Sequence, residues 1–323
     1  MALTAVSLFS GCGGFDYGAT QAGLQIIWAN DKDRYTYEAY HSILPNVPLH
    51  IQDIRTIRDF PEADVLIGCY PCTGFSIAAR RKWKDREERD LLKTEGNFLY
   101  MEYLRALSLI KPKYFFVENV LGMASAMEGW FFQQQLDGFR ELGYTPKATL
   151  LHAIQFGLPQ DRKRVFIVGV RNDIVDNLNY TFPTATHGPG LLPYRTLRDA
   201  IWDMPRNPIG EYDDECFHGH YLTRNRKRGW DEASFTIVAS SAHVPLHPDG
   251  DPMVQIGKDK WQLQGDFNRR LSWRECARLQ GFPDFINPDG SLKDKYRVIG
   301  NAVPPVFAYN LIRPIVEFEA RQA

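Results

Sequence analysis

Hydrophobic and polar positions in the first half of the chain alternate between two periods. Short continuous apolar runs predict buried strands at residues 5–9, 25–29, 64–67, 114–117 and 164–170. Between them, apolar residues recur at helical spacing over residues 15–22, 33–42, 97–110 and 130–142. Strand–helix alternation of this kind predicts an α/β fold, a doubly wound and mostly parallel sheet with helices on both faces.

The pattern changes after about residue 171. Residues 172–265 are rich in Pro, Gly, Asp and His and show no clear period, which predicts a second, smaller and irregular domain. Regular signals return at Ser272 and Glu275, which are spaced as a capping box that opens a helix. A final helix is predicted over residues 303–316, with Pro304 and Pro305 near its first turn.

Composition narrows the class of protein only in part. The chain has 323 residues, of which 44% are hydrophobic, enough for a sizeable core. No apolar run approaches the roughly 20 residues of a membrane span. Five cysteines form an odd, sparse set, which favours a reducing, cytoplasmic setting. The net charge of −1 gives no global basic signature, although a local basic face is enough to bind nucleic acid.

A glycine-rich turn follows the first predicted strand. It reads Phe9-Ser10-Gly11-Cys12-Gly13-Gly14-Phe15 and leads directly into the first predicted helix. Glycines at such a turn let the backbone approach a ligand closely. Asp16 stands where the dinucleotide fingerprint requires glycine, which disfavours a nicotinamide or flavin cofactor. A tight turn without a ligand is the alternative.

Two acidic residues follow at suggestive places. Asp31 comes about 20 residues after the glycine turn, where a carboxylate can accept hydrogen bonds from both ribose hydroxyls. Asp53 lies beyond the next predicted helix and could accept from an adenine amino group. Taken alone, Asp31 is equally consistent with a surface residue, and an Asp at the position of Asp53 is more often an ordinary turn residue.

Pro71 and Cys72 follow the strand predicted at residues 64–67. Reactive groups in open α/β sheets gather at the carboxyl ends of strands, where nearby backbone N–H groups can favour a thiolate nucleophile. Three alternatives stay open. Cys69 and Cys72 have redox spacing, they could form half a zinc site, or Cys72 could be an inert core residue. No second cysteine pair exists to complete a metal site, so we expect no metal.

Glu118 and Asn119 end the strand predicted at residues 114–117. A carboxyl beside an apolar pocket can keep its proton at neutral pH and donate to a ring nitrogen. Further along, Arg162 and Arg164 alternate on an extended segment, so both face one side and suit phosphate or carbonyl oxygens. A solvated strand end and a solvated charged edge are the respective alternatives.

Taken together and in order, these stretches resemble the cytosine-5 DNA methyltransferase family of bacterial restriction–modification systems. Two downstream stretches, residues 274–283 and residues 300–303, also match, so the resemblance runs from residue 4 to about residue 312 with one unmatched gap near residues 172–270. Two departures stand out. Thr73 and Gly74 follow Cys72 where relatives commonly carry Gln, and Asp31 stands where Glu is usual.

The resemblance implies an organisation, a cofactor and partners. Residues 1–175 form a catalytic and cofactor-binding domain of the S-adenosylmethionine-dependent methyltransferase type, completed by residues 290–323, and residues 176–289 form a target-recognition domain. The expected partners are duplex DNA and, functionally, a restriction endonuclease, and the chain is expected to be a monomer. S-adenosyl-L-methionine is expected to contact Phe9, Gly11, Gly13, Gly14, Asp31, Asp53, Ile54, Pro71, Asn301, Ala302 and Val303.

The resemblance also implies the chemistry. The target cytosine is flipped out of the duplex. The Cys72 thiolate adds to C6, Glu118 supports N3, and Arg164 holds the carbonyl oxygen at position 2. Arg162 and Asn119 support this geometry, and the methyl group is transferred to C5.

DNA contacts are expected from two regions. The charged segment of residues 76–96, with Arg80 and Arg81, is predicted to be a lid over the pocket, the alternative being a solvated helix face. In the recognition domain the candidates are Arg224, Arg226 and Arg228, with Thr236 from a short Thr-plus-aliphatic element of the family. Four histidines of this region are expected to be scattered on the surface: His218, His220, His243 and His247.

Four other functions fit the sequence less well. Some relatives of the family methylate cytosine in transfer RNA, and the long recognition insert favours DNA. A redox protein built on Cys69 and Cys72 predicts no role for Glu118 or Arg164. A catalytically dead DNA-binding relative is disfavoured by the intact Cys72 and Glu118. An enzyme that methylates amino groups is disfavoured because its Asp/Asn-Pro-Pro-aromatic motif is absent.

Overall fold

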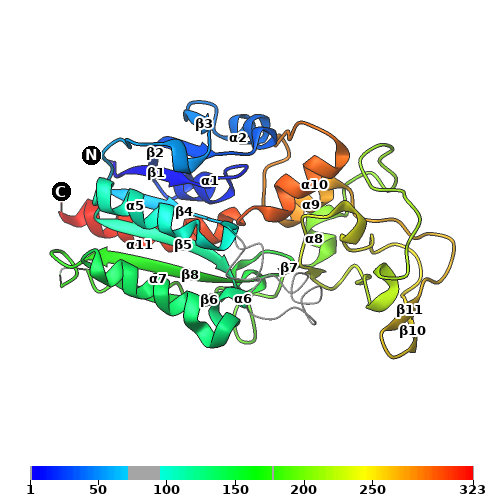
Figure 1. The fold of residues 1–323 in the computed structure, drawn as a ribbon. Helices are drawn as coiled ribbons and strands as arrows, with labels where there is room; N and C mark the ends of the chain where they lie inside the picture. Colours follow the sequence, from blue (N-terminus) through cyan, green and yellow to red (C-terminus); the bar gives the residue numbers. More distant parts are fainter. Residues whose placement is uncertain (1, 72–94, 177, 323) are drawn as a thin grey trace.

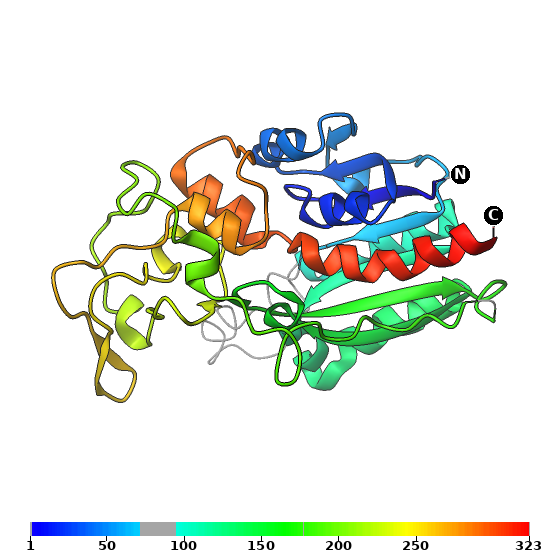
Figure 2. The same cartoon turned by 180° about the vertical axis from the view of Figure 1, so that it is seen from behind.

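The fold combines a large sheet with an irregular lobe at one end of it (Figure 1). The computed structural model describes residues 2–71, 95–176 and 178–322. The lobe lies at the same end of the sheet as the loops that form the site (Figure 2). Both termini lie at the opposite end (Figure 1).

The sheet has seven strands in the order β3-β2-β1-β4-β5-β8-β6. β3, β2, β1, β4 and β5 pair in parallel, and β8 pairs antiparallel with both β5 and β6, so β8 alone runs against the other six strands. The strand order reverses between β1 and β4, the place where open α/β sheets bind ligands. The strands are β1 (Thr4–Leu8), β2 (Gln25–Asp31), β3 (Leu49–Ile51), β4 (Val65–Gly68), β5 (Tyr114–Val120), β6 (Tyr144–His152) and β8 (Lys163–Arg171).

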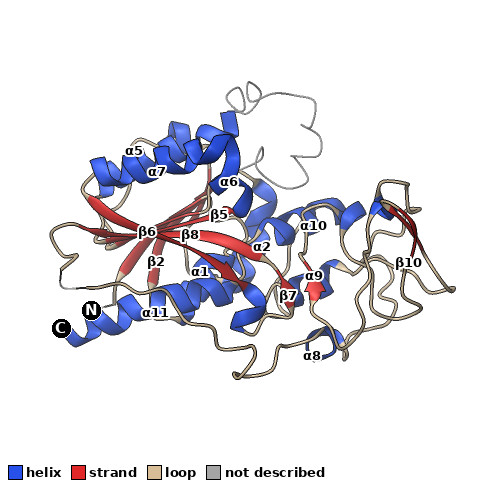
Figure 3. Ribbon diagram, turned by 90° about the horizontal axis from the view of Figure 1, so that it is seen from below, coloured by secondary structure: helices blue, strands red, loops and turns tan. Residues whose placement is uncertain are grey.

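Helices cover both faces of the sheet (Figure 3). On one face lie α1 (Gly14–Gln21) and α11 (Pro305–Gln322), and on the other α5 (Tyr100–Ile110) and α7 (Trp130–Glu141). Alternation along β5, which is buried from Tyr114 to Asn119, supplies both cores. Phe116 joins the cluster that contains α11, whereas Phe115 and Val117 join the cluster that contains α5. The fold class predicted from the sequence is therefore confirmed.

The lobe is built from short elements. The lobe is joined to the sheet domain by the parallel pairing of β7 (Gln160–Asp161) with β9 (Ser234–Phe235). The chain returns through α9 and α10 to α11, which lies along the sheet (Figure 2). The remaining elements are α8 (Leu197–Ile201), η6 (Tyr221–Thr223), η7 (Ser241–His243), β10 (Val254–Gly257), β11 (Lys260–Gln262), α9 (Trp273–Leu279) and α10 (Leu292–Asn301).

Local sequence signals account for several helix starts. The predicted capping box of Ser272 and Glu275 opens α9, and Ser291 with Asp294 caps α10 in the same way. The opening of α2 (Tyr37–Ile43) is preceded by a 3-10 turn, η1 (Arg34–Thr36), whose N-cap is Asp33. Within the described residues, no helix has the length and apolar character needed to cross a membrane.

Candidate active site

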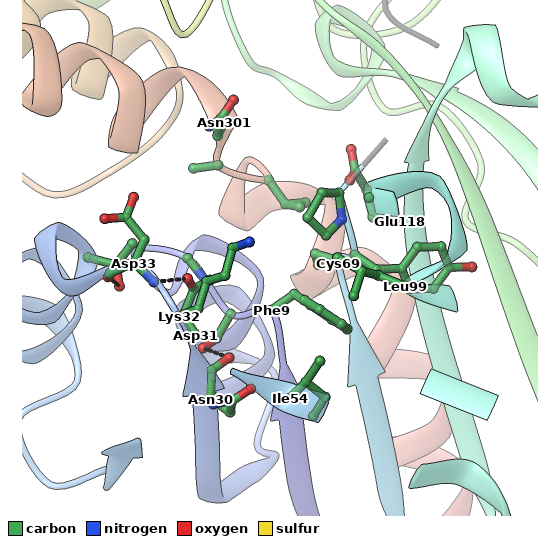
Figure 4. Close-up of a pocket in the computed structure, with 18 of the residues that line it drawn as sticks. Phe9, Asn30, Asp31, Lys32, Asp33, Ile54, Cys69, Leu99, Glu118 and Asn301 are labelled. Carbon is green, nitrogen blue, oxygen red and sulfur yellow. Dashed lines mark hydrogen bonds between the residues drawn. The ribbon is translucent and has the colours of Figure 1, made fainter. Parts of the chain in front are cut away.

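A pocket of about 690 Å³ opens at the carboxyl ends of β1, β2, β4 and β5. Figure 4 shows Asp31 and Glu118 on opposite sides of this pocket, with Phe9 between them and Asn301 contributed by the returning chain. Four segments that are far apart in sequence therefore meet at the switch point of the sheet.

The glycine turn forms one wall. The Ser10 amide and hydroxyl both donate to the Asn30 carbonyl, each at 3.0 Å, which ties the turn to β2. Phe9 and Gly11 each take a φ of 55°, and a Cβ built on Gly11 meets nothing within 4 Å. The backbone at Gly11 therefore borders open pocket space, as a loop that receives a ligand requires.

Gly13 and Gly14 do not line the pocket. A Cβ on Gly13 would meet the Tyr40 ring at 2.8 Å, and one on Gly14 would lie 2.1 Å from the Val303 carbonyl oxygen. The structure thus gives these two predicted cofactor residues a packing role behind the loop, where Gly14 lets the returning segment approach.

Asp31 is the last residue of β2 and lines the pocket. Its two carboxylate oxygens accept from the amides of Gly11 and Asp33, each at 2.8 Å. Burial raises the pKa of this carboxyl, although the two amide donors oppose the shift. The oriented carboxylate keeps lone pairs for hydroxyl donors of a ligand.

Asp53 and Ile54 form a further part of the lining. The side-chain hydrogen bond from Arg55, with a 2.7 Å ion pair, lowers the pKa of Asp53 to about 2. Ile54 is 3% exposed and offers an apolar surface beside that carboxylate. This combination suits a flat, partly polar ring.

Glu118 and Arg164 form an ion pair across β5 and β8. The Arg164 Nε lies 2.8 Å from Glu118 Oε1. Burial raises the pKa of Glu118, and the neighbouring Arg164 and Arg162 only partly offset it. The strand continues through Glu118 and Asn119 to Val120, beyond the end predicted at residue 117, and the antiparallel register with β8 sets Val120 opposite Arg164.

Asn119 and Arg162 are buried in different ways. The Asn119 Oδ1 accepts from the Val120 amide at 2.8 Å, and its buried Nδ2 has no partner among the described residues. Arg162 is 1% exposed, does not line the pocket, and donates to backbone carbonyls of the chain itself. The two arginines of the predicted pair therefore have different partners, and only Arg164 reaches the pocket.

Asn301, Ala302 and Val303 line the pocket from the segment between α10 and α11, and Pro71 lines it at the end of β4. Cys72, Arg80 and Arg81 lie outside the described residues. Several further residues line the pocket that were not predicted to bind a ligand: Asn30, Lys32, Asp33, Gln52, Arg55, Cys69, Tyr70, Glu95, Gly96, Leu99, Arg297 and Val298. Nearness to the carboxyl ends of β2 and β4 was a usable signal for Asn30, Lys32, Asp33, Cys69 and Tyr70, whereas the others are brought in by segments without such a signal.

The predicted DNA contacts of the lobe differ in exposure. Arg224 is exposed, and Arg228 forms a 2.8 Å ion pair with Glu232. Arg226 is only 5% exposed and donates to the carbonyl of His243 at 2.9 Å, so the basic run is not one continuous surface. Thr236 donates its hydroxyl to the Asp161 carbonyl.

The expectation of scattered surface histidines is met only in part: His218 and His220 are exposed, but the histidines are not scattered. The rings of His218, His220 and His243 lie with centroids 5.3–6.5 Å apart, and His247 is 3% exposed. Across the described parts of the chain, no group of three or more His, Cys, Asp or Glu side chains is arranged to hold a metal ion.

The pocket lies at the switch point of an open α/β sheet and is lined by a glycine-rich turn and by acidic side chains. This combination is typical of enzymes that bind a nucleotide-containing cofactor. The buried pair of Glu118 and Arg164 lies at the far side of that pocket. The sequence profile of the family described as C-5 cytosine-specific DNA methylase matches residues 3–317. The chain belongs to this family and is a DNA (cytosine-5) methyltransferase.

Individual relatives support this assignment. The chain is similar to the Type II methyltransferase M.BsuRI of Bacillus subtilis, with 38% identity over 98% of this chain and 80% of that protein. The Type II methyltransferase M.BspRI of Lysinibacillus sphaericus is 39% identical over 98% of this chain and 82% of its own length. M.FnuDI of Fusobacterium nucleatum, also a Type II methyltransferase, is 37% identical over 97% and 94%, respectively.

Solved structures share the fold. The Entamoeba histolytica methyltransferase EhMeth superposes with a TM-score of 0.71 at 15% identity, covering 98% of both chains. A Spodoptera frugiperda DNMT2 mutant gives a TM-score of 0.68 at 17% identity, covering 97% of this chain and 99% of that one. Both comparisons support the fold alone.

Proposed function

We propose that the Asp31 side of the pocket binds S-adenosyl-L-methionine and that the Glu118 side receives a cytosine flipped out of duplex DNA. The observation that carries this proposal is the single pocket that both carboxylates line. When bound, S-adenosyl-L-methionine supplies the methyl group that becomes attached to cytosine C5.

The residues present fit this cofactor. The open space at Gly11 allows close approach of a ligand, and the oriented Asp31 carboxylate suits two ribose hydroxyls. Asp53 offers an acceptor and Ile54 an apolar face for an adenine ring. Phe9, Pro71 and the returning Asn301, Ala302 and Val303 close the pocket around these groups.

Cys72 is proposed as the nucleophile. Its thiolate forms a bond to C6 of the cytosine, which makes C5 electron-rich, and the same bond breaks when the proton leaves C5 to a base such as water. Pro71, the preceding residue in the chain, lines the pocket. Cys69 also lines it, but burial raises the pKa of its thiol, which makes it a poor nucleophile.

Glu118, Arg164 and Asn119 are proposed to hold the ring. Burial favours the protonated carboxyl of Glu118, which can place a proton at N3 and so prevent negative charge from building up on the ring. The Arg164 guanidinium, paired with Glu118, is suited to the carbonyl oxygen at position 2. The unpartnered Asn119 Nδ2 is a further donor at this end of the pocket.

DNA contacts are proposed from Arg224, Arg228 and Thr236 in the lobe, together with Arg80 and Arg81. The burial and backbone partners of Arg226 favour a structural role for that residue. Because the similar proteins are Type II methyltransferases, we also propose that the enzyme protects DNA beside a restriction endonuclease. We propose that it acts as a monomer, because the family motifs all lie in one chain.

Transfer of a labelled methyl group tests this function. Wild type, Cys72→Ser and Cys69→Ser are each given labelled S-adenosyl-L-methionine with unmethylated duplex DNA or with transfer RNA. We expect label at C5 of cytosine in DNA for wild type and Cys69→Ser and none for Cys72→Ser, and sequencing maps the site. Transfer only to RNA, or equal transfer by Cys72→Ser, contradicts the proposal.

A further inference from the structure

Arg162 holds an unusual position for a buried charge. It is 1% exposed, yet every hydrogen-bond acceptor of its guanidinium is a backbone carbonyl. Its Nε is buried and has no partner among the described residues. Burial lowers the pKa of Arg162, and Arg164 lowers it further, while Glu118 opposes the shift. Such a costly arrangement indicates a specific role beyond filling space.

The carbonyls belong to two separate segments. Arg162 Nη2 donates to Ala302 at 2.8 Å and to Gly300 at 3.3 Å, and both residues line the pocket. Arg162 Nη1 donates to Ile237 at 3.0 Å. Ile237 lies in residues 234–239 of the lobe, which we call the docking segment.

The docking segment is held closely. The Ile237 amide donates to Gln160 Oε1 at 2.9 Å, and Gln160 Nε2 donates to the Leu279 carbonyl at 2.9 Å. A Cβ on Gly300 would lie 2.4 Å from the backbone of Val238, so the docking segment and the pocket wall are in direct backbone contact. A shift of one is therefore transmitted to the other.

We propose that Arg162 is a positioning residue that couples DNA binding at the lobe to cofactor binding in the pocket. This inference rests on the proposed function, because it requires the cofactor to contact residues 300–303. DNA contacts near Thr236 fix the position of the docking segment. The Arg162 guanidinium then fixes the carbonyls of Gly300 and Ala302, so that the cofactor binds against an ordered segment of the pocket lining. By linkage, the cofactor strengthens DNA binding by the same factor.

Calorimetry with S-adenosylhomocysteine tests the coupling. The dissociation constant is measured with and without a duplex oligonucleotide that carries the site mapped by methyl transfer. For wild type we expect DNA to tighten binding about fivefold or more. Arg162→Lys keeps the charge but cannot span three carbonyls. The ratio of the dissociation constant without DNA to that with DNA should therefore fall towards one. Arg171→Lys, at the other end of β8, should keep the wild-type ratio.

Hydrogen exchange supplies a readout that needs no variant. Adding S-adenosylhomocysteine to wild type should slow amide exchange in residues 234–239, through the bond network around Ile237. Unchanged exchange there, or a full coupling ratio in Arg162→Lys, overturns the inference while leaving the proposed function intact. Failure of wild type to bind S-adenosylhomocysteine rejects both together.

Discussion

At the scale of single residues, burial sets the chemistry of the site. Glu118 and Asp31 line one pocket and both have a raised pKa, but their partners differ: an arginine side chain for Glu118 and two backbone amides for Asp31. The first is suited to hold a proton at a ring, and the second to accept from hydroxyls. Two similar carboxylates are therefore assigned to different ligands by their surroundings.

Glu118→Gln tests the proton at N3. We expect the single-turnover rate of methyl transfer to fall about 100-fold or more, the range typical of general acid–base groups. Because the raised pKa favours the protonated form, the wild-type rate should decline as pH rises through that pKa. The variant should lack this decline.

Glu141→Gln, which changes an exposed carboxylate at the end of α7, serves as the control. Rates are compared from acidic to alkaline pH for all three proteins. An unchanged alkaline decline in Glu118→Gln argues against the assignment of that proton to Glu118.

Asp16 gives a prediction for stability. Its carboxylate is fully buried and accepts from the hydroxyls of Ser7 and Tyr40, each at 2.7 Å. Burial raises its pKa from 3.8 to about 6, so the folded state holds the proton more tightly than the unfolded state. Wild type should lose about 3 kcal/mol relative to Asp16→Asn as pH rises from about 4 to about 6, at 1.36 kcal/mol per pKa unit.

Urea unfolding of both proteins at several pH values measures this difference. The comparison with the variant cancels the carboxylates that both proteins share, such as Asp53, whose lowered pKa acts in the opposite direction. A constant difference across this pH window means that Asp16 does not titrate as its burial indicates.

At the scale of helices and strands, the sequence predicted what local pattern determines. Buried strands such as β1, β4 and β5 are apolar on both faces, and the predicted helices carry clear stop signals. The edge strand β6 was missed because it mixes exposed and buried positions without strict alternation, and the three-residue β3 is too short for a pattern.

The residues of the site also divide into those that local sequence pattern predicts and those that it does not. Motif residues such as Asp31 and Glu118 could be located because they end or lie on predicted strands. Partners supplied by distant segments could not, because sequence spacing carries no record of them. The contacts of Arg162 with Ile237 and Ala302, 75 and 140 residues away, are of this kind.

Gly14→Ala tests the contact between the start of α1 and the returning segment. The new Cβ would lie 2.1 Å from the Val303 carbonyl oxygen, so the segment must move. We expect a loss of about 1–3 kcal/mol in the free energy of unfolding, as for other overpacked sites, and weaker cofactor binding.

Gly219→Ala is the matched control, because a Cβ there meets nothing within 4 Å. Both variants are compared by denaturant unfolding and by binding of S-adenosylhomocysteine. Equal effects in the two variants would mean that the returning segment accommodates the new Cβ at Gly14 without a loss of stability or of cofactor binding.

At the scale of the whole molecule, the two predicted domains share a hydrophobic core. One cluster joins Ala29 and Tyr40 from the sheet domain, Ile201 and Ile237 from the lobe, and Ile299 from the returning chain. Their boundaries remain a prediction, but a continuous core makes separate folding of the two parts unfavourable.

Cooperative unfolding is therefore expected. Far-UV circular dichroism reports mainly on the helices around the sheet, and fluorescence reports on tryptophans such as Trp202, Trp230 and Trp273 of the lobe and its return. The two signals should give one coincident transition in urea. Two separated transitions would show that the sheet domain and the lobe unfold independently despite the shared cluster.

The proposed mechanism depends on covalent attack by Cys72 on a cytosine held in this pocket. The most direct measurement uses duplex DNA in which 5-fluorocytosine replaces cytosine, because fluorine cannot leave C5 as the proton does and the bond between sulfur and C6 persists. With S-adenosyl-L-methionine, wild type and Cys69→Ser should form a complex that survives denaturing electrophoresis, and mass spectrometry should locate the link at Cys72. A complex formed equally by Cys72→Ser, or a link at another residue, would rule out Cys72 as the nucleophile.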